Sequence, residues 1–162
     1  MQLETLRFGM IEIDENRLIT FHDGIPGLEK YRSYALLQFS ESYPIIWLQS
    51  SDDGSICLPV LDTYAVLSEY VFDIDDDDVK TLKLNRPDEL HVVSVLVIPD
   101  DIQQMTANLA APILINTTTR VGKQIVLTGS DYNVRFPVFQ DICRVVSREE
   151  DEADAGTVKE AQ

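Results

Sequence analysis

The chain has 162 residues, 44% of them hydrophobic, which is enough for one domain with a sizeable core. Its 28 acidic and 13 basic side chains give a net charge of −15, and such a protein repels the phosphate backbone of nucleic acids. Apolar runs long enough to cross a membrane and the features of a secretory signal are both missing, so we expect a cytoplasmic protein that contacts neither membrane nor nucleic acid directly.

Short apolar runs rich in Val, Ile, Tyr and Phe recur between turn residues, which indicates β-strands. In chain order they span 18–21, 34–39, 45–48, 56–61, 92–98, 113–115 and 125–127. The run 92–98 is almost continuously apolar and predicts a central strand covered on both faces. The last two runs flank a polar turn and predict a hairpin. The pattern favours an all-β fold, a small single-domain β-barrel or sandwich-like fold.

Little helix is expected, one or two short helical turns in all. Residues 77–82 can start a short helix, because the acids at its beginning favour a helix N-terminus, and residues 99–105 can form another turn or two. The segment 64–72 lacks clean alternation and is interpreted as a structured loop or edge. Residues 148–162 are acidic, small and polar, so we predict a β domain over 1–147 followed by an acidic disordered tail.

The negative charge is concentrated in one part of the chain. Residues 51–100 hold twelve acidic and three basic side chains, a net charge of −9, whereas residues 101–150 hold five of each. A surface of this kind suits a basic protein partner and speeds encounter with it at low salt. Solubility alone is the simpler interpretation of the same charge.

The sequence lacks every catalytic and metal-binding template that we compared with it. Gly122-Lys123 ends like a phosphate-binding loop, but Thr117 stands where the first glycine is needed. A calcium loop starting at Asp73 has an aspartate at the glycine position and a leucine at the final glutamate position. The two histidines are isolated, and the two cysteines are too far apart for a zinc pair, so two separate buried thiols are expected. We therefore expect a protein that binds no metal or cofactor and is not an enzyme.

Five sequence blocks carry a more specific signal. They are the segment MTANLAAPILIN at 105–116, the segment RVGKQIVL at 120–127, DGIPGLE at 23–29, WLQS at 47–50, and the ending formed by Tyr132, Arg135 and Pro137. In this order the blocks resemble the flagellar assembly factor family FliW, and the resemblance extends over about residues 5–138.

The resemblance implies a non-enzymatic regulator of flagellum assembly. Members of the family bind flagellin and, alternatively, the homodimeric RNA-binding translational repressor CsrA, so that flagellin synthesis is coupled to flagellin export. An export chaperone for flagellin without a role in translation is the first alternative. A small β-barrel enzyme is the second, and the missing acid–base or metal constellation argues against it.

The partner-binding surface is predicted from charge and from candidate apolar anchors. The acidic run Asp75, Asp76, Asp77 and Asp78, preceded by Glu69 and Tyr70, is placed against CsrA, where it repels RNA. Apolar anchors are also needed, because rim charges contribute rate and specificity more than affinity. The predicted anchors are Tyr70, Phe72, Met105 and Leu109, and an ordinary place in the core is the alternative for each of them. Asn108 completes the predicted contact set, although a hydrogen bond within a turn is its simpler role.

Overall fold

The computed structural model describes the backbone of residues 1–160 and the side chains of residues 1–152. The strands are β1 Gln2–Thr5, β2 Gly9–Glu12, β3 Ile19–Thr20, β4 Ser33–Gln38, β5 Ile46–Ser50, β6 Cys57–Asp62, β7 Leu90–Val97, β8 Thr106–Ala107, β9 Ile113–Asn116, β10 Val121–Gln124 and β11 Phe136–Pro137. The α-helices are α1 Thr63–Val66, α2 Asp76–Leu82 and α3 Phe139–Glu160. Short 3-10 helices span Glu15–Arg17, Ser40–Ser42, Pro87–Glu89 and Ile102–Gln104.

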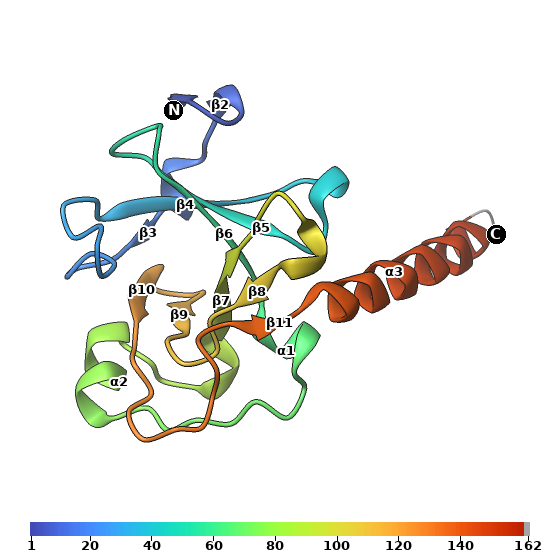
Figure 1. The fold of residues 1–162 in the computed structure, drawn as a ribbon. Helices are drawn as coiled ribbons and strands as arrows, with labels where there is room; N and C mark the ends of the chain where they lie inside the picture. Colours follow the sequence, from blue (N-terminus) through green and yellow to red (C-terminus); the bar gives the residue numbers. More distant parts are fainter. Residues whose placement is uncertain (161–162) are drawn as a thin grey trace.

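Seven of these strands close into a barrel (Figure 1). The order around the barrel is β7-β6-β5-β4-β3-β10-β9, and β9 pairs again with β7. All of these pairs are antiparallel except β3 with β10, which meet through the single residue pair Thr20 and Val121. Strands β8 and β11 extend the sheet beyond β7, and β1 with β2 forms a separate hairpin. The predicted all-β barrel is therefore confirmed.

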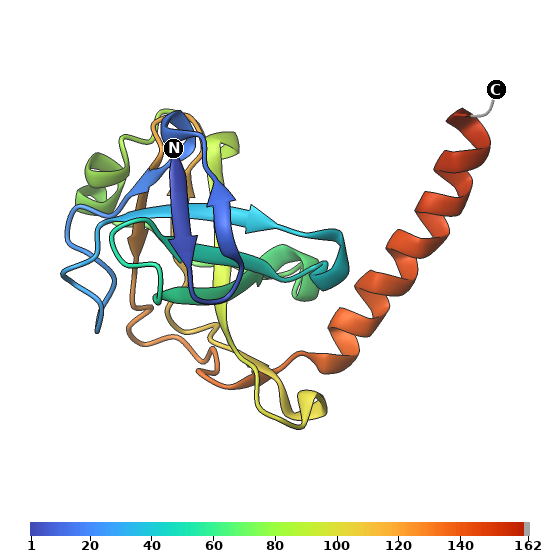
Figure 2. The ribbon, with the colours of Figure 1, turned by 90° about the horizontal axis from the view of Figure 1, so that it is seen from above.

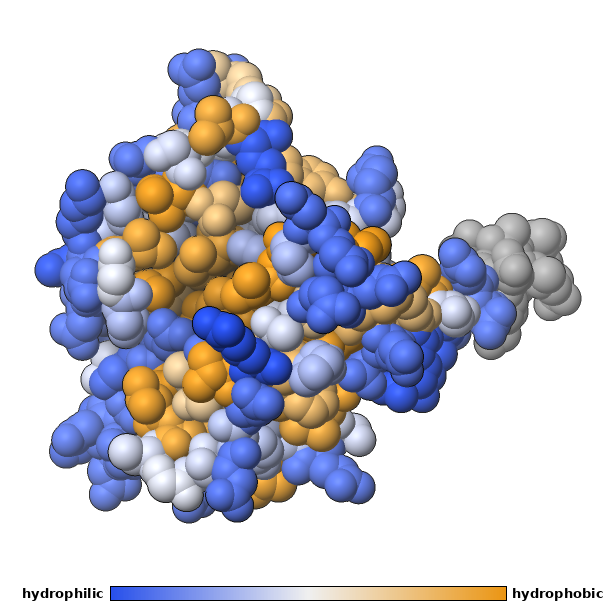
Figure 3. Space-filling view, viewed as in Figure 1, coloured by the Kyte–Doolittle hydropathy of each residue, from blue (hydrophilic) through white to orange (hydrophobic). Residues whose placement is uncertain are grey.

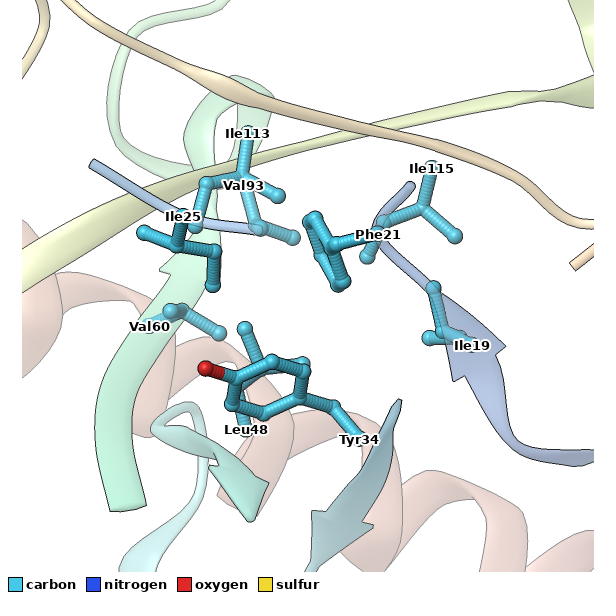
Figure 4. Packing of buried hydrophobic residues seen from close by; sticks show 9 residues of the cluster. All are labelled: Ile19, Phe21, Ile25, Tyr34, Leu48, Val60, Val93, Ile113 and Ile115. Carbon is cyan, nitrogen blue, oxygen red and sulfur yellow. The ribbon is translucent and has the colours of Figure 1, made fainter. Parts of the chain in front are cut away.

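The barrel interior is filled by apolar side chains from strands that are far apart in sequence. Figure 4 shows Phe21 and Tyr34 facing one another at the centre, with Ile19, Leu48, Val60 and Ile113 among the side chains around them. The two rings meet edge to face with centroids 5.3 Å apart. A Cβ added at Gly122 would lie 2.6 Å from the Phe21 ring, so only glycine fits at this position of β10.

The outer face of the barrel carries two further clusters. Beside α1 and the start of α3, Leu61, Leu96 and Ile142 belong to one of them. Beside α2, Leu82, Val92 and Leu114 belong to the other. Each fully buried aliphatic side chain contributes about 1.5–3 kcal/mol. In the face shown in Figure 3, apolar surface gathers over the barrel and hydrophilic side chains surround it.

Most predicted strands lie where the sequence pattern places them, including β7, which is buried over much of its length and pairs with β6, β8 and β9. The predicted helix at 77–82 is α2, and the turn at 99–105 contains the 3-10 helix Ile102–Gln104. The predicted position of the second strand of the hairpin is wrong. The strand is Val121–Gln124 rather than 125–127, because Gln124 pairs with Ile113 and Gly122 with Ile115.

The C-terminal segment differs from the prediction of a disordered tail beginning at 148. Helix α3 continues through Glu160 and projects away from the barrel (Figures 1 and 2), while residues 161–162 of the predicted tail lie outside the described residues. Ile142 and Val145 are buried in the first turns of α3. Forming the first turn of a helix is unfavourable, and the burial of these side chains offsets that cost. The glutamates that follow are good helix formers, so the helix continues through a segment whose acidic and polar composition predicted disorder.

Among the residues that the structure describes, no helix combines the length and the apolar character needed to span a membrane.

Candidate functional site

Residues at the two ends of helix α2 cap it locally. Asp75 is the N-cap, and its Oδ1 accepts a hydrogen bond from the backbone N–H of Asp78 at 2.8 Å. Asp76, Asp77 and Asp78 fill the first turn, where the positive end of the helix dipole favours carboxylates. The helix ends at Lys83, which adopts the left-handed conformation with φ of 55°. The acidic run is thus also a helix-starting sequence.

The family-like segments at 105–116 and 120–127 hold this helix on the barrel. Lys123 on β10 forms an ion pair with Asp78, and its hydrogen bond to that carboxylate raises the pKa of the Lys123 ammonium. At the other end of the helix, Asn116 Nδ2 donates to the carbonyl oxygens of Leu82 at 2.9 Å and Lys83 at 3.2 Å. The signature residues therefore position α2 from both ends.

The four predicted aspartates separate into two groups. Asp75, Asp76 and Asp77 are exposed, whereas Asp78 is nearly buried and paired with Lys123. Asp78 therefore holds the helix in place, and the structure leaves three carboxylates available at the surface. Glu69, predicted to lead into this run, is also exposed.

Three of the four predicted apolar anchors are core residues. Tyr70, Met105 and Leu109 are 2%, 5% and 1% exposed, so they are unavailable to a partner in this structure. The Tyr70 hydroxyl donates to the carbonyl oxygen of Leu109, which ties the segment before α2 to the 105–116 segment. Burial raises the pKa of Tyr70 above its ordinary value. Alternation is absent around these residues, so the sequence pattern gives no sign of which side faces inward.

Neighbouring contacts fix the chain that leads into α2. The Tyr132 ring packs 4.6 Å from the Tyr70 ring, and its hydroxyl accepts from the N–H of Val71 and donates to the carbonyl of Val71. Asn108 Oδ1 accepts hydrogen bonds from the N–H groups of Ala110 and Ala111. Asn108 is therefore a turn-forming residue, the simpler of the two roles considered for it.

An apolar groove of about 430 Å³ lies beside α2. Its apolar lining comes from the helix, from the segment before it and from β7, and consists mainly of Tyr64, Phe72, Ile74, Val79, Leu84 and Leu90. Tyr64 is 44% exposed and the others are partly exposed. Phe72 is the one predicted anchor that lines this groove. The alternation Phe72-Asp73-Ile74-Asp75 is a sequence signal that identifies two of the lining residues.

The surroundings of the groove are acidic. Residues 62–92 carry nine acidic and three basic side chains, a net charge of −6. Arg86 lines the groove, and its guanidinium lies 3.4 Å from Asp88 and 3.8 Å from Glu89, so its charge is offset within the chain. A mobile cation or a basic protein surface would therefore be attracted to this region.

A second hollow, of about 760 Å³, opens at the end of the barrel. Leu36, Ile46 and Ile115 line it, together with Arg17 and Arg120. The Arg120 guanidinium donates to the backbone carbonyl of Arg17, and burial lowers the pKa of Arg120. Arg120, the first residue of the 120–127 segment, thus closes the barrel end by bonding two loops.

The arrangement around α2 offers contact surface. Among the residues with described side chains, no three His, Cys, Asp or Glu are grouped as metal ligands. Cys57 and Cys143 are separate free thiols, as predicted, but neither is fully buried, because Cys57 is partly exposed and Cys143 is exposed on α3. The acidic helix and the adjoining groove together provide charge and apolar area, the two components of a protein-binding surface.

Comparison with known proteins gives consistent results. The family described as FliW protein matches residues 2–138. The chain is 35% identical over 143 residues to the flagellar assembly factor FliW of Thermoanaerobacter pseudethanolicus, covering 88% of this chain and 95% of the relative. It is 38% identical over 130 residues to that of Thermosipho africanus, covering 80% and 90%. A crystal structure of the flagellar assembly factor FliW superposes with a TM-score of 0.81 at 31% identity, covering 86% of this chain and 97% of the other.

Proposed function

The chain belongs to the FliW family of flagellar assembly factors, and from this membership we propose that it acts by binding flagellin and, alternatively, the translational repressor CsrA. Bound flagellin occupies the factor while export is slow. Free factor captures CsrA and relieves the block on translation of flagellin. The protein thereby couples flagellin synthesis to export through competing protein–protein equilibria, in the cytoplasm and without chemistry of its own.

The observation that supports this proposal is the exposed acidic row Asp75, Asp76 and Asp77 at the start of α2. An RNA-binding protein needs a basic surface to hold phosphates. A partner that brings several carboxylates close to that surface competes with RNA for the same positive charge. Because screening at physiological salt has a range of about 8 Å, the effect requires the acidic row to lie close to the bound RNA.

The structure limits which side chains serve this purpose. Asp78 is committed to the ion pair with Lys123, so replacing it would move the helix as well as remove a charge. Asp75 caps the helix, and asparagine is an equally good N-cap residue. The triple variant Asp75→Asn/Asp76→Asn/Asp77→Asn therefore removes three surface charges and keeps the N-cap hydrogen bond of α2, while it loses the attraction of about 0.3–1 kcal/mol between each first-turn carboxylate and the helix dipole.

The experiment has two parts. The purified chain is first tested for binding to purified flagellin and to CsrA in a pull-down. Release of labelled RNA from CsrA is then followed by fluorescence anisotropy at low and at physiological salt. A charge-matched control, Glu4→Gln/Glu41→Gln/Asp100→Asn, removes three exposed charges elsewhere.

The acidic triple variant is expected to release RNA less effectively and with a weaker salt dependence, whereas the control variant behaves like the wild type. Equal RNA release by all three proteins at low salt would refute the electrostatic part of the proposal. Binding to flagellin without binding to CsrA would instead identify an export chaperone without a translational role, and binding to neither would refute the proposal as a whole.

A further inference from the structure

We infer that the apolar groove beside α2 is a docking site for an amphipathic helix whose apolar stripe is bordered by Lys and Arg. This inference rests on the proposed function and specifies the kind of partner segment that the acidic region receives. The groove is defined by Tyr64, Phe72, Ile74, Val79, Leu84 and Leu90.

The groove has the size and composition of a binding site. Its volume of about 430 Å³ lies in the range of roughly 300–1,000 Å³ typical of ligand sites. Val92 is buried at its floor, while Phe72, Ile74 and Leu84 remain partly exposed along it. Partly exposed apolar side chains around a buried floor gain further burial when a partner inserts apolar groups between them.

The charge around the groove identifies the partner. Asp73 and Asp75 alternate with the lining residues Phe72 and Ile74, and the segment 62–92, which supplies the whole lining, carries a net charge of −6 with its three basic side chains included. The occupant therefore needs apolar side chains that enter the groove and positive charges that flank them. An amphipathic helix places its apolar stripe between two polar borders, and one with Lys or Arg at those borders complements this site.

A helix also matches the shape of the site. Side chains at positions i, i+3 and i+4 of a helix are neighbours about 5–6 Å apart, so two or three of them enter one compact groove together. In an extended strand, successive side chains point to opposite faces, and a single pocket of this size would receive fewer of them. The acidic surroundings in turn disfavour an acidic amphipathic helix through repulsion.

The test uses two labelled peptides of about 18 residues, long enough for five helical turns. Both have the same Leu, Ala and Lys composition, but only one has its leucines in a single helical stripe. Binding to the wild-type chain is measured by fluorescence anisotropy. The amphipathic peptide is expected to bind at least about tenfold more tightly than the scrambled one. Equal binding of both would show attraction by bulk charge and would overturn the inference.

Two variants locate the bound peptide. Ile74→Gln/Leu84→Gln places amides in the groove, and Val97→Gln/Ile102→Gln changes two exposed apolar residues away from it. The groove variant is expected to lose about tenfold in affinity and the control variant none. Loss in both variants, or in neither, would overturn the inference.

A measurement on the unmodified chain covers the case in which the groove variant misfolds. Methyl resonances of isotopically labelled wild-type protein are followed by NMR during titration with the amphipathic peptide. The methyl resonances of Ile74, Val79 and Leu84 are expected to shift. Peptide-induced shifts at other methyl groups, with these three unchanged, would overturn the inference.

The failure of the inference is distinguishable from failure of the proposed function. If the folded groove variant still binds flagellin and CsrA like the wild type while its affinity for the amphipathic peptide is lost, the groove is not the site of these partners and the inference fails. If the wild type binds neither protein, the proposed function fails.

Discussion

Replacing Asn116 by alanine tests whether residues of the 105–116 segment hold the acidic helix. The Asn116 side chain is completely buried and makes four hydrogen bonds. Its amide nitrogen donates to the carbonyls of Leu82 and Lys83, and its oxygen accepts from the N–H groups of Thr118 and Thr119. Asn116→Ala removes all four at once, and of the two carbonyls only that of Leu82 keeps another side-chain donor, the Thr119 hydroxyl at 3.2 Å.

The expected cost follows from these contacts. A hydrogen bond contributes about 1 kcal/mol net, and a buried group left without a partner costs more. The N–H of the exposed Thr118 can donate to water instead, so we expect a loss of about 3 kcal/mol in the free energy of unfolding. For a chain of this size each kcal/mol lowers Tm by about 2–4 °C. Hydrogen exchange at the α2 amides is expected to accelerate more than exchange in the barrel strands.

The assay is urea unfolding together with hydrogen exchange read out by mass spectrometry. The matched control is Asn133→Ala, because Asn133 is exposed and its side-chain oxygen accepts one hydrogen bond, from the N–H of Arg135. The control is expected to lose less than about 1 kcal/mol. A loss below about 1 kcal/mol in Asn116→Ala, or uniform acceleration of exchange across the chain, would refute the role of Asn116 as the tether of α2.

Three further outcomes are expected. Lys123→Met leaves the Asp78 carboxylate without its cation, and because this pair is partly exposed we expect a loss of about 1–2 kcal/mol in the free energy of unfolding by urea. The same replacement is expected to cost less in an Asp78→Asn background, and an equal cost in both backgrounds would contradict the pairing. Burial raises the pKa of Tyr34 from 10.0 to about 12, so below pH 10 it adds no pH dependence, and between pH 10 and 12 the unfolded state ionises first and stability falls by about 1.4 kcal/mol per pH unit; a Tyr34→Phe variant that loses stability equally steeply would contradict this origin. Gly122→Ala forces a methyl group against the Phe21 ring and is expected to cost about 1–3 kcal/mol, with part of the loss recovered in Phe21→Leu/Gly122→Ala; no recovery would place the strain elsewhere.

Much of the barrel was predictable because strand patterns are local. The run 92–98 is almost continuously apolar, and β7 is a central strand that pairs with β6, β8 and β9. The helix at 77–82 was predictable for the same reason, since its cap and its first-turn carboxylates are contiguous in sequence. The second strand of the hairpin was misplaced by a few residues, because its register depends on pairing with Ile113 and not on its own composition.

The candidate site was predicted in part. The acidic row lies at the surface as expected, and Phe72 lines the groove, but Tyr70 and Leu109 are core residues. The distinction is physical. Carboxylates that lack a partner stay in water, so their exposure follows from composition, whereas an aromatic or aliphatic side chain is stable in either environment when a neighbouring segment covers it.

The sequence by itself determined an acidic, strand-rich chain with the motifs of a flagellar assembly factor, because strand periodicity, charge and motif wording are properties of neighbouring residues. Only the tertiary structure decided what those motifs do. Asn116 and Lys123 reach α2 across more than thirty positions of chain, and the groove beside that helix is built from segments that meet only after the barrel closes. Contacts between distant residues are set by packing of the whole chain, which local patterns do not encode.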